Sequence, residues 1–209
     1  MSAVLRGPDG AAPLPPDWLD KVSLPIISIA PRSNLYRVHS KDNDPVFFGP
    51  RAGQPPTYRF DPASGAFGVL YAAPNPDAAM IETLLRNPQR LTVDYKAIES
   101  RALSILKAGR DIRLVLAYGD GLSKIGTTVA LSTGPYEACA LWSDALHRHP
   151  DAPDGIMFES RHNPDAHCIA LFERADYCLE VHETVLLTDM LVDVGTLLDR
   201  YGKSIFGLT

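Results

Sequence analysis

Short segments in which apolar and polar residues alternate recur along the chain, and this period of two predicts β-strands. Residues 35–39 form the first such segment. Residues 58–60 and 67–72 flank Pro62 and Gly65, so they predict two strands joined by a turn. Further strands are predicted over 112–118, 155–158, 168–172 and 177–187.

Four segments predict helices. The clearest covers 75–86, because Asn75 can cap its first turn and Pro76 can occupy the first helical position. The others cover 95–106, 135–148 and 188–201, the last ending at Gly202. Since these helices and strands do not alternate regularly, the pattern predicts an α+β fold of short sheets flanked by helices.

The first part of the chain is rich in proline, which disfavours helices and central strands. Ten of the 18 prolines lie within residues 1–56. We therefore expect residues 1–30 to form an arm over a single domain of residues 31–209. The expected anchors of the arm are Trp18, Leu19, Ile26 and Ile27.

Composition narrows the class of protein. The chain has 209 residues, of which 45% are hydrophobic and 22% charged, and these values are typical of a globular domain. Its net charge of -5 lacks the positive field that nucleic-acid binding needs, so no direct nucleic-acid partner is expected. No apolar run is long enough for a membrane span or an export signal, so a soluble, unexported protein is expected. We expect the three cysteines, Cys139, Cys168 and Cys178, to be small core residues of a protein in a reducing cytoplasm.

Several common motifs are incomplete. Gly121 and Gly126 have the spacing of a phosphate-binding loop, but Thr127 stands where that mechanism needs a lysine. The histidines at 147, 149, 162 and 167 have no typical metal-ligand spacing, so no metal is expected. A metal-dependent hydrolase built on residues 147–167 remains an alternative.

Four polar residues interrupt apolar stretches and are the remaining candidates for chemistry, namely Arg37, Arg59, Glu82 and Ser160. Each has an ordinary explanation when taken singly. Glu82, for example, can pair with Arg86 one helical turn later. Their joint occurrence carries more information than any one of them.

The segments that contain these residues resemble, in order and spacing, the RES-domain family. The resemblance covers roughly residues 34–175, and the family is named for an arginine, a glutamate and a serine that here are Arg37, Glu82 and Ser160. The matching segments are Leu-Tyr-Arg-Val-His at 35–39, Tyr-Arg-Phe-Asp-Pro at 58–62, Gly-Val-Leu-Tyr-Ala-Ala at 68–73, Ile-Glu-Thr at 81–83 and Asp-Gly-Ile-Met-Phe-Glu-Ser-Arg at 154–161.

The resemblance implies a fold similar to ADP-ribosyltransferases and an enzyme that consumes NAD as its substrate. It implies cleavage of the nicotinamide–ribose bond and transfer of ADP-ribose to water, phosphate or a protein. It also implies a bacterial toxin with an Xre-type antitoxin as its protein partner, and a homodimer is possible. The alternative is a catalytically inactive domain of the same fold that binds nucleotides or proteins.

The implied chemistry gives each residue an expected role. Glu82 would stabilise the oxocarbenium-like ribose, and Ser160 would orient the amide or a ribose hydroxyl. Arg37 and Arg59 would bind the pyrophosphate, because guanidinium groups contact phosphate bidentately. Tyr71 and Tyr36 would stack on a base. These roles require Arg37 and Glu82 to converge on one cleft.

Overall fold

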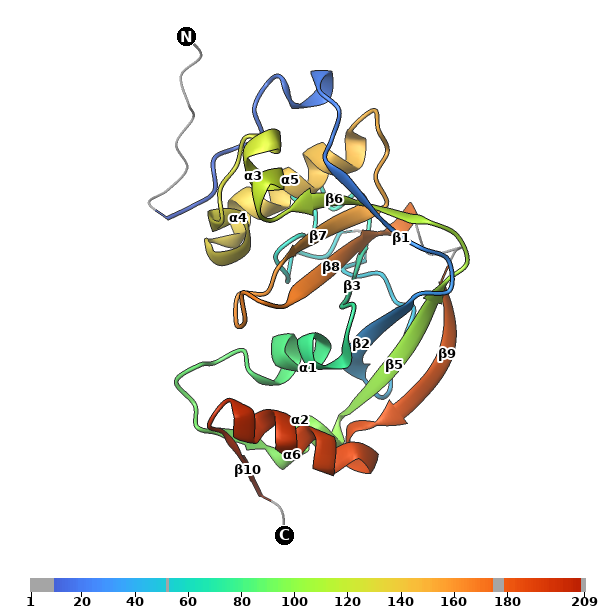
Figure 1. Ribbon diagram of the computed structural model, residues 1–209, viewed down its shortest axis with the longest axis vertical. Helices are drawn as coiled ribbons and strands as arrows, with labels where there is room; N and C mark the ends of the chain where they lie inside the picture. The colour runs from blue at the N-terminus through green and yellow to red at the C-terminus, as the bar shows by residue number, and fades with distance from the viewer. Residues whose placement is uncertain (1–9, 52, 175–178, 208–209) are drawn as a thin grey trace.

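The computed structural model describes residues 10–51, 53–174 and 179–207, which form two main sheets, a short two-stranded sheet and the helices packed on them (Figure 1). The larger sheet has the strand order β1-β6-β7-β8-β3, in which only β6 and β7 are parallel neighbours. The strands are β1 (Ile26–Ile29), β3 (Val69–Ala72), β6 (Ile112–Ala117), β7 (Gly155–Glu159) and β8 (His167–Phe172). Helices α3 (Asp120–Ile125), α4 (Ala130–Thr133) and α5 (Tyr136–Arg148) gather in the upper half of Figure 1.

The second sheet is antiparallel, with the order β2-β5-β9, and lies in the lower half of Figure 1. Its strands are β2 (Asn34–Ser40), β5 (Arg101–Ala108) and β9 (Leu179–Leu186). Beside it lie α1 (Pro76–Leu84), α2 (Tyr95–Glu99) and α6 (Leu191–Arg200), together with the short parallel pair β4 (Thr92–Asp94) and β10 (Ser204–Phe206). Two short 3₁₀ helices, η1 (Leu19–Lys21) and η3 (Leu187–Met190), lie before β1 and before α6.

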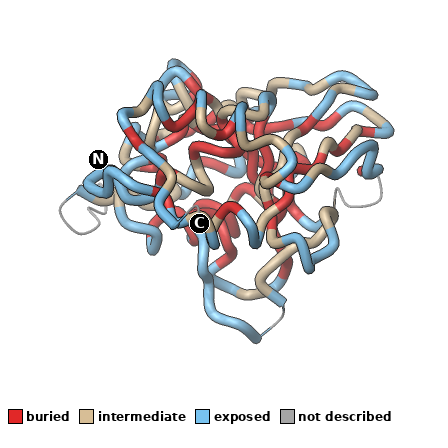
Figure 2. Tube along the Cα trace, turned by 90° about the horizontal axis from the view of Figure 1, so that it is seen from below, coloured by how far each residue is buried: buried red, intermediate tan, exposed pale blue. Residues whose placement is uncertain are grey.

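Three apolar clusters hold these layers together, and Figure 2 shows the buried chain at the centre of the molecule. Trp142 on α5 is fully buried in the first cluster with Phe60 and Phe172. The second cluster joins α1 to α6, and the third joins the two sheets through side chains such as Leu70 and Leu106. Backbone hydrogen bonds between Tyr36 and Ala73 connect the sheets directly.

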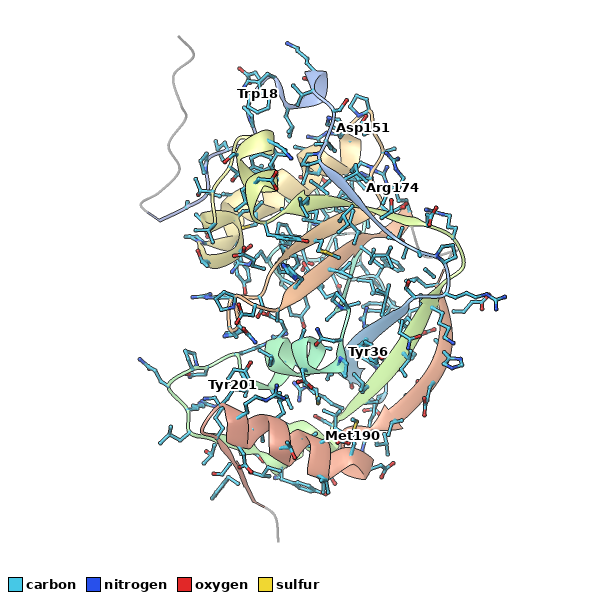
Figure 3. The ribbon with its side chains drawn as sticks, viewed as in Figure 1. Trp18, Tyr36, Asp151, Arg174, Met190 and Tyr201 are labelled. Carbon is cyan, nitrogen blue, oxygen red and sulfur yellow. The ribbon has the colours of Figure 1, made fainter. Side chains whose placement is uncertain are left out.

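The segment before β2 takes part in the upper half of the molecule. Ala12, Leu19 and Leu24 are buried in the same cluster as Trp142. The Trp142 indole nitrogen donates a 2.6 Å hydrogen bond to the Pro13 carbonyl. Ile26 and Ile27 on β1 are half-buried, whereas Trp18 is 42% exposed. Trp18 lies on the segment at the top of Figure 3. Strand β1 pairs with β6 and forms one edge of the larger sheet.

Most of the elements predicted from the alternation and the helix signals are confirmed. These are the strands at 35–39, 67–72, 112–118, 155–158 and 168–172 and the helices at 75–86, 135–148 and 188–201, the last beginning as η3. The final strand is confirmed over 179–186, and residues 177 and 178, including Cys178, lie outside the described part. None of the helices in the described ranges is long and apolar enough to cross a bilayer.

Two predicted elements are wrong. The helix predicted over 95–106 ends at Glu99, because β5 begins at Arg101 and pairs with strands on both of its sides. Residues 58–60 form a turn and no strand. The Asp61 carboxylate accepts hydrogen bonds from the backbone N–H groups of Thr57 and Tyr58, and these bonds fold the segment back on itself.

The His147 ring, near the end of α5, lies stacked on Phe67 with 3.8 Å between ring centroids. Desolvation, reinforced by the charge of Arg174, lowers its pKa to about 4. The unfolded chain therefore takes up this proton at a higher pH than the native protein does. As the pH falls from about 6.5 to about 4, this histidine reduces the free energy of unfolding.

We expect His147→Phe to flatten the fall in stability over this pH range, by at most about 1.4 kcal/mol per pH unit. Urea denaturation at several pH values measures the slope. His182→Phe, at an exposed position, is the control. An equal change of slope in both variants would contradict the assignment to His147.

Candidate functional site

A cavity of about 790 Å³ is lined by residues from both halves of the molecule. Its walls come from β2, the loop over 49–61, β3, α1 and the segment that joins β7 to β8. Of the residues singled out in the sequence, Tyr36, Arg37, Arg59, Tyr71 and Glu82 all line it. The structure therefore brings Arg37 and Glu82 to one cavity from different elements.

Local structure explains why α1 presents polar groups to this cavity. Ala78, Glu82 and Arg86 follow one another at four-residue spacing, so they lie along one face of the helix and its C-terminal end. Asn75 caps the helix by accepting the Ala78 N–H at 2.8 Å, as its sequence predicts. The small side chain of Ala78 leaves the cavity open beside Glu82.

Arg37 carries a buried guanidinium nitrogen, Nη1, that has no hydrogen-bond partner in the described part of the protein. Desolvation lowers the pKa of Arg37 to about 10, although Tyr58 and Asp44 oppose the effect. A buried donor without an acceptor is costly, and such groups are rare in folded proteins. The arrangement suits an anionic ligand that would supply the missing acceptor.

Glu82 is held by Ser160, which follows β7. The Ser160 hydroxyl donates to Glu82 Oε1 at 2.5 Å and accepts the backbone N–H groups of His162 and Asn163, each at 3.1 Å. A hydroxyl has one proton and two lone pairs, so these contacts use its full capacity. Ser160 is buried, and this geometry favours positioning of Glu82 over the expected contact with the substrate.

Arg59 and Tyr71 line the cavity but also hold its walls together. Arg59 Nη1 donates to the Gly134 carbonyl at 2.8 Å, and its guanidinium lies over the Tyr136 ring. The Tyr71 hydroxyl donates to Asp61 at 3.0 Å. Desolvation, reinforced by Asp61, raises the pKa of Tyr71 well above its ordinary value. One nitrogen of Arg59 and the hydroxyl of Tyr71 therefore have structural partners already.

Sequence reasoning missed several polar residues that line the cavity, namely His39, Arg86, Arg101, Arg161, His162 and Cys168. Arg86 carried a signal, because it follows Glu82 by one helical turn. Arg101 carried none, since its segment was expected to be helical. Desolvation lowers the pKa of His162, and the Glu82 charge opposes this effect. Desolvation and the Glu82 charge both raise the pKa of Cys168.

The histidines considered for a metal site have other neighbours. His147 stacks on Phe67, and the His167 ring lies 4.1 Å from that of Tyr118. The His149 ring nitrogen Nε2 is 3.0 Å from the Leu19 carbonyl. Within the described residues, no three His, Cys, Asp or Glu side chains form a cluster that could hold a metal ion. The metal-dependent hydrolase alternative therefore has no cluster of metal ligands among the described residues.

Comparisons with known proteins match the same region. Residues 34–190 match the RES domain. A protein described as probable toxin y4kH, from Sinorhizobium fredii (strain NBRC 101917 / NGR234), is 37% identical over 78 residues, which are 37% of this chain. The match spans 61% of that relative's length.

A chain from the crystal structure of the M. tuberculosis MbcT–MbcA toxin–antitoxin complex has a similar fold. The TM-score is 0.61 at 16% identity, over 80% of this chain and 90% of that chain. This likeness confirms the expected α+β fold. Since the RES-domain match covers most of the sequence and includes Arg37, Glu82 and Ser160, the chain belongs to the RES-domain family.

Proposed function

We propose that this protein is an enzyme that consumes NAD by breaking the bond between nicotinamide and ribose. One cavity of a RES-family chain brings together the Glu82 carboxylate and an Arg37 guanidinium nitrogen that has no partner among the described residues, and this observation carries the proposal. The cavity of about 790 Å³ has the size of a small-molecule or cofactor site. It offers one group for the pyrophosphate and another for the reacting sugar.

The chemistry follows from charge. When the glycosidic bond breaks, its electron pair goes to the nicotinamide nitrogen, which becomes neutral, and the ribose C1′ becomes cationic. The Glu82 carboxylate, fixed by Ser160, stabilises that cation. An oxygen of the acceptor then bonds to C1′. When the acceptor is water, its proton passes to the solvent, whereas an anionic phosphate oxygen has no proton to lose. Arg37 binds the pyrophosphate, and the remaining surface of Arg59, Tyr71 and Tyr36 orients the dinucleotide.

We further propose that the enzyme is a growth-inhibiting toxin that acts in the cytoplasm and is neutralised by an Xre-type antitoxin. Two similarities support this role. The S. fredii relative is described as a probable toxin, and the similar fold comes from a toxin–antitoxin complex. Co-expression with a candidate antitoxin should restore the growth of cells that produce the protein.

The test is incubation of the purified protein with NAD, followed by separation of nicotinamide and the ADP-ribose product. Reactions with and without inorganic phosphate and a cell lysate identify the acceptor, and a chelator arm tests for metal dependence. Nicotinamide release is expected. If NAD binds and no nicotinamide appears in any arm, the protein is the inactive binding domain and the enzymatic proposal is wrong.

Ser160→Ala should lower kcat by about ten- to a hundredfold with little change in KM, because the Glu82 carboxylate loses the hydroxyl that fixes it. Ser160→Thr retains a hydroxyl and should recover part of the rate. Ser123→Ala, on α3 and outside the cavity lining, is the control. A rise in KM at unchanged kcat would instead assign Ser160 to substrate binding.

A further inference from the structure

The C-terminal end of α6 and the residues that follow it hold α1 at its start and just beyond its end. Arg200 Nη2 pairs with Asp77 Oδ2 at 2.6 Å, in the first turn of α1. The buried Lys203 ammonium group donates to three backbone carbonyls of the loop that follows α1, those of Asn87, Pro88 and Arg90. An ammonium group has three N–H donors, so these contacts use its full capacity. The helix that carries Glu82 is therefore fixed by residues close to the C-terminus.

Between these two residues, Tyr201 contacts the segment that follows Ser160. Tyr201 ends α6 and lies in the lower half of the molecule (Figure 3). Asn163 Nδ2 donates to the Tyr201 hydroxyl at 2.8 Å. The side-chain amide of Asn163 has one possible orientation, because its Oδ1 accepts the backbone N–H of Asp165 at 3.0 Å. The Tyr201 oxygen is therefore the acceptor in this contact.

An unbroken series of hydrogen bonds runs from Tyr201 to the Glu82 carboxylate. Asn163, held by Tyr201 through its side chain, donates its backbone N–H to the Ser160 hydroxyl at 3.1 Å. The Ser160 hydroxyl in turn donates to Glu82 Oε1 at 2.5 Å. The backbone N–H groups occupy the lone pairs of the serine oxygen, so its proton is directed at the carboxylate. A group that orients Asn163 therefore also orients Glu82.

The ring of Tyr201 has an anchor that does not depend on its hydroxyl. It is half-buried and packs against the apolar cluster that joins α1 to α6, which includes Ile81 and Leu198. Removal of the oxygen alone should leave the ring in place. Tyr201 does not line the cavity, so an effect of its hydroxyl on the reaction must pass through other residues.

We propose that Tyr201 is a positioning residue that acts on Glu82 through Asn163 and Ser160. It lies outside residues 34–190, so the family match assigns it no role. Its effect on the rate rests on the proposed function, whereas the hydrogen bonds that it supports do not depend on the identity of the substrate.

The experiment is a double-mutant cycle on the full chain, with nicotinamide release from NAD as the readout. The variants are Tyr201→Phe, Ser160→Ala and the combination of both. Tyr201→Phe should lower kcat by about three- to tenfold and leave KM within about twofold, because a misplaced carboxylate loses stabilisation in the transition state. In the Ser160→Ala background, the same change should lower kcat by less than about 1.5-fold, because the path to Glu82 is already broken.

Tyr95→Phe, at a half-buried position on α2 outside the cavity lining, is the matched control and should change neither parameter. The unfolding temperature verifies the fold of each variant. Asn163→Ala removes the same hydrogen bond from its other side and replaces Tyr201→Phe if that variant fails to fold. An equal loss of kcat in both backgrounds would overturn the proposal, and so would wild-type kcat in Tyr201→Phe.

A second readout needs no turnover. Hydrogen exchange of the backbone N–H groups of His162 and Asn163, measured by NMR without NAD, reports whether they still bond to the Ser160 hydroxyl. Tyr201→Phe should speed this exchange by about three- to tenfold, and Tyr95→Phe should leave it unchanged. If the wild type releases no nicotinamide and the exchange still speeds up, the proposed function is wrong and the positioning of Ser160 stands. Unchanged exchange would overturn the role of Tyr201 whether or not the protein consumes NAD.

Discussion

Glu82→Gln should abolish measurable NAD consumption, with a loss of about 10²- to 10⁴-fold in rate. The substitution removes the negative charge that stabilises the ribose cation but retains the shape of the side chain. The amide oxygen of glutamine can still accept the Ser160 hydroxyl, so the local hydrogen bonds survive. The loss should appear in kcat, because the cation exists only in the transition state.

Release of nicotinamide from NAD under saturating conditions measures this effect, and the unfolding temperature of the variant verifies its fold. Glu137→Gln, at an exposed position on α5, removes an equal charge and is the control. Turnover by the Glu82 variant within threefold of the wild type would exclude Glu82 from the reaction. A variant that fails to fold would be replaced by Glu82→Ala in the same assay.

Arg37→Met should weaken NAD binding by about ten- to a hundredfold, since hydrogen bonds to charged groups contribute about 1.5–3 kcal/mol. The same change should leave the ligand-free protein as stable as the wild type, or more stable. The fall in the Arg37 pKa from its ordinary value to about 10 corresponds to on the order of 3 kcal/mol for keeping this charge largely away from water. Methionine removes that cost and retains much of the volume.

Calorimetry with NAD measures the change in affinity, and urea denaturation without NAD measures the change in stability. Arg32→Met, at an exposed position just before β2, is the control and should change neither. If Arg37→Met instead lowers the stability of the ligand-free protein and leaves NAD affinity intact, Arg37 has a structural role, and the assignment of the pyrophosphate to it is wrong.

Local sequence signals predicted most of the elements, because caps and alternation are local properties. Asn75 and Pro76 marked the start of α1 correctly. The local signals failed for β5. The segment after Glu99 is apolar enough for a helix or a strand, and pairing with β2 and β9 selects the strand. That choice depends on residues far away in the sequence.

The candidate site was predictable only as a set of residues. The roles implied by the family resemblance required Arg37 and Glu82 to share a cleft, and the cavity contains both. Spacing could not indicate that the Ser160 hydroxyl is saturated by Glu82 and two backbone N–H groups. Nor could it predict that Arg59 binds the Gly134 carbonyl, since that contact depends on the loop between α4 and α5.

The pairing of β1 with β6 has a practical consequence for anyone who clones this domain. A gene fragment trimmed to residues 34–190, the limits of the family match, would lose β1, α6 and β10. The edge of β6 would then be open to other chains, and Val194 and Leu198 would no longer cover their apolar cluster. Such a fragment should accumulate in inclusion bodies, and the full 209 residues are the better choice for expression.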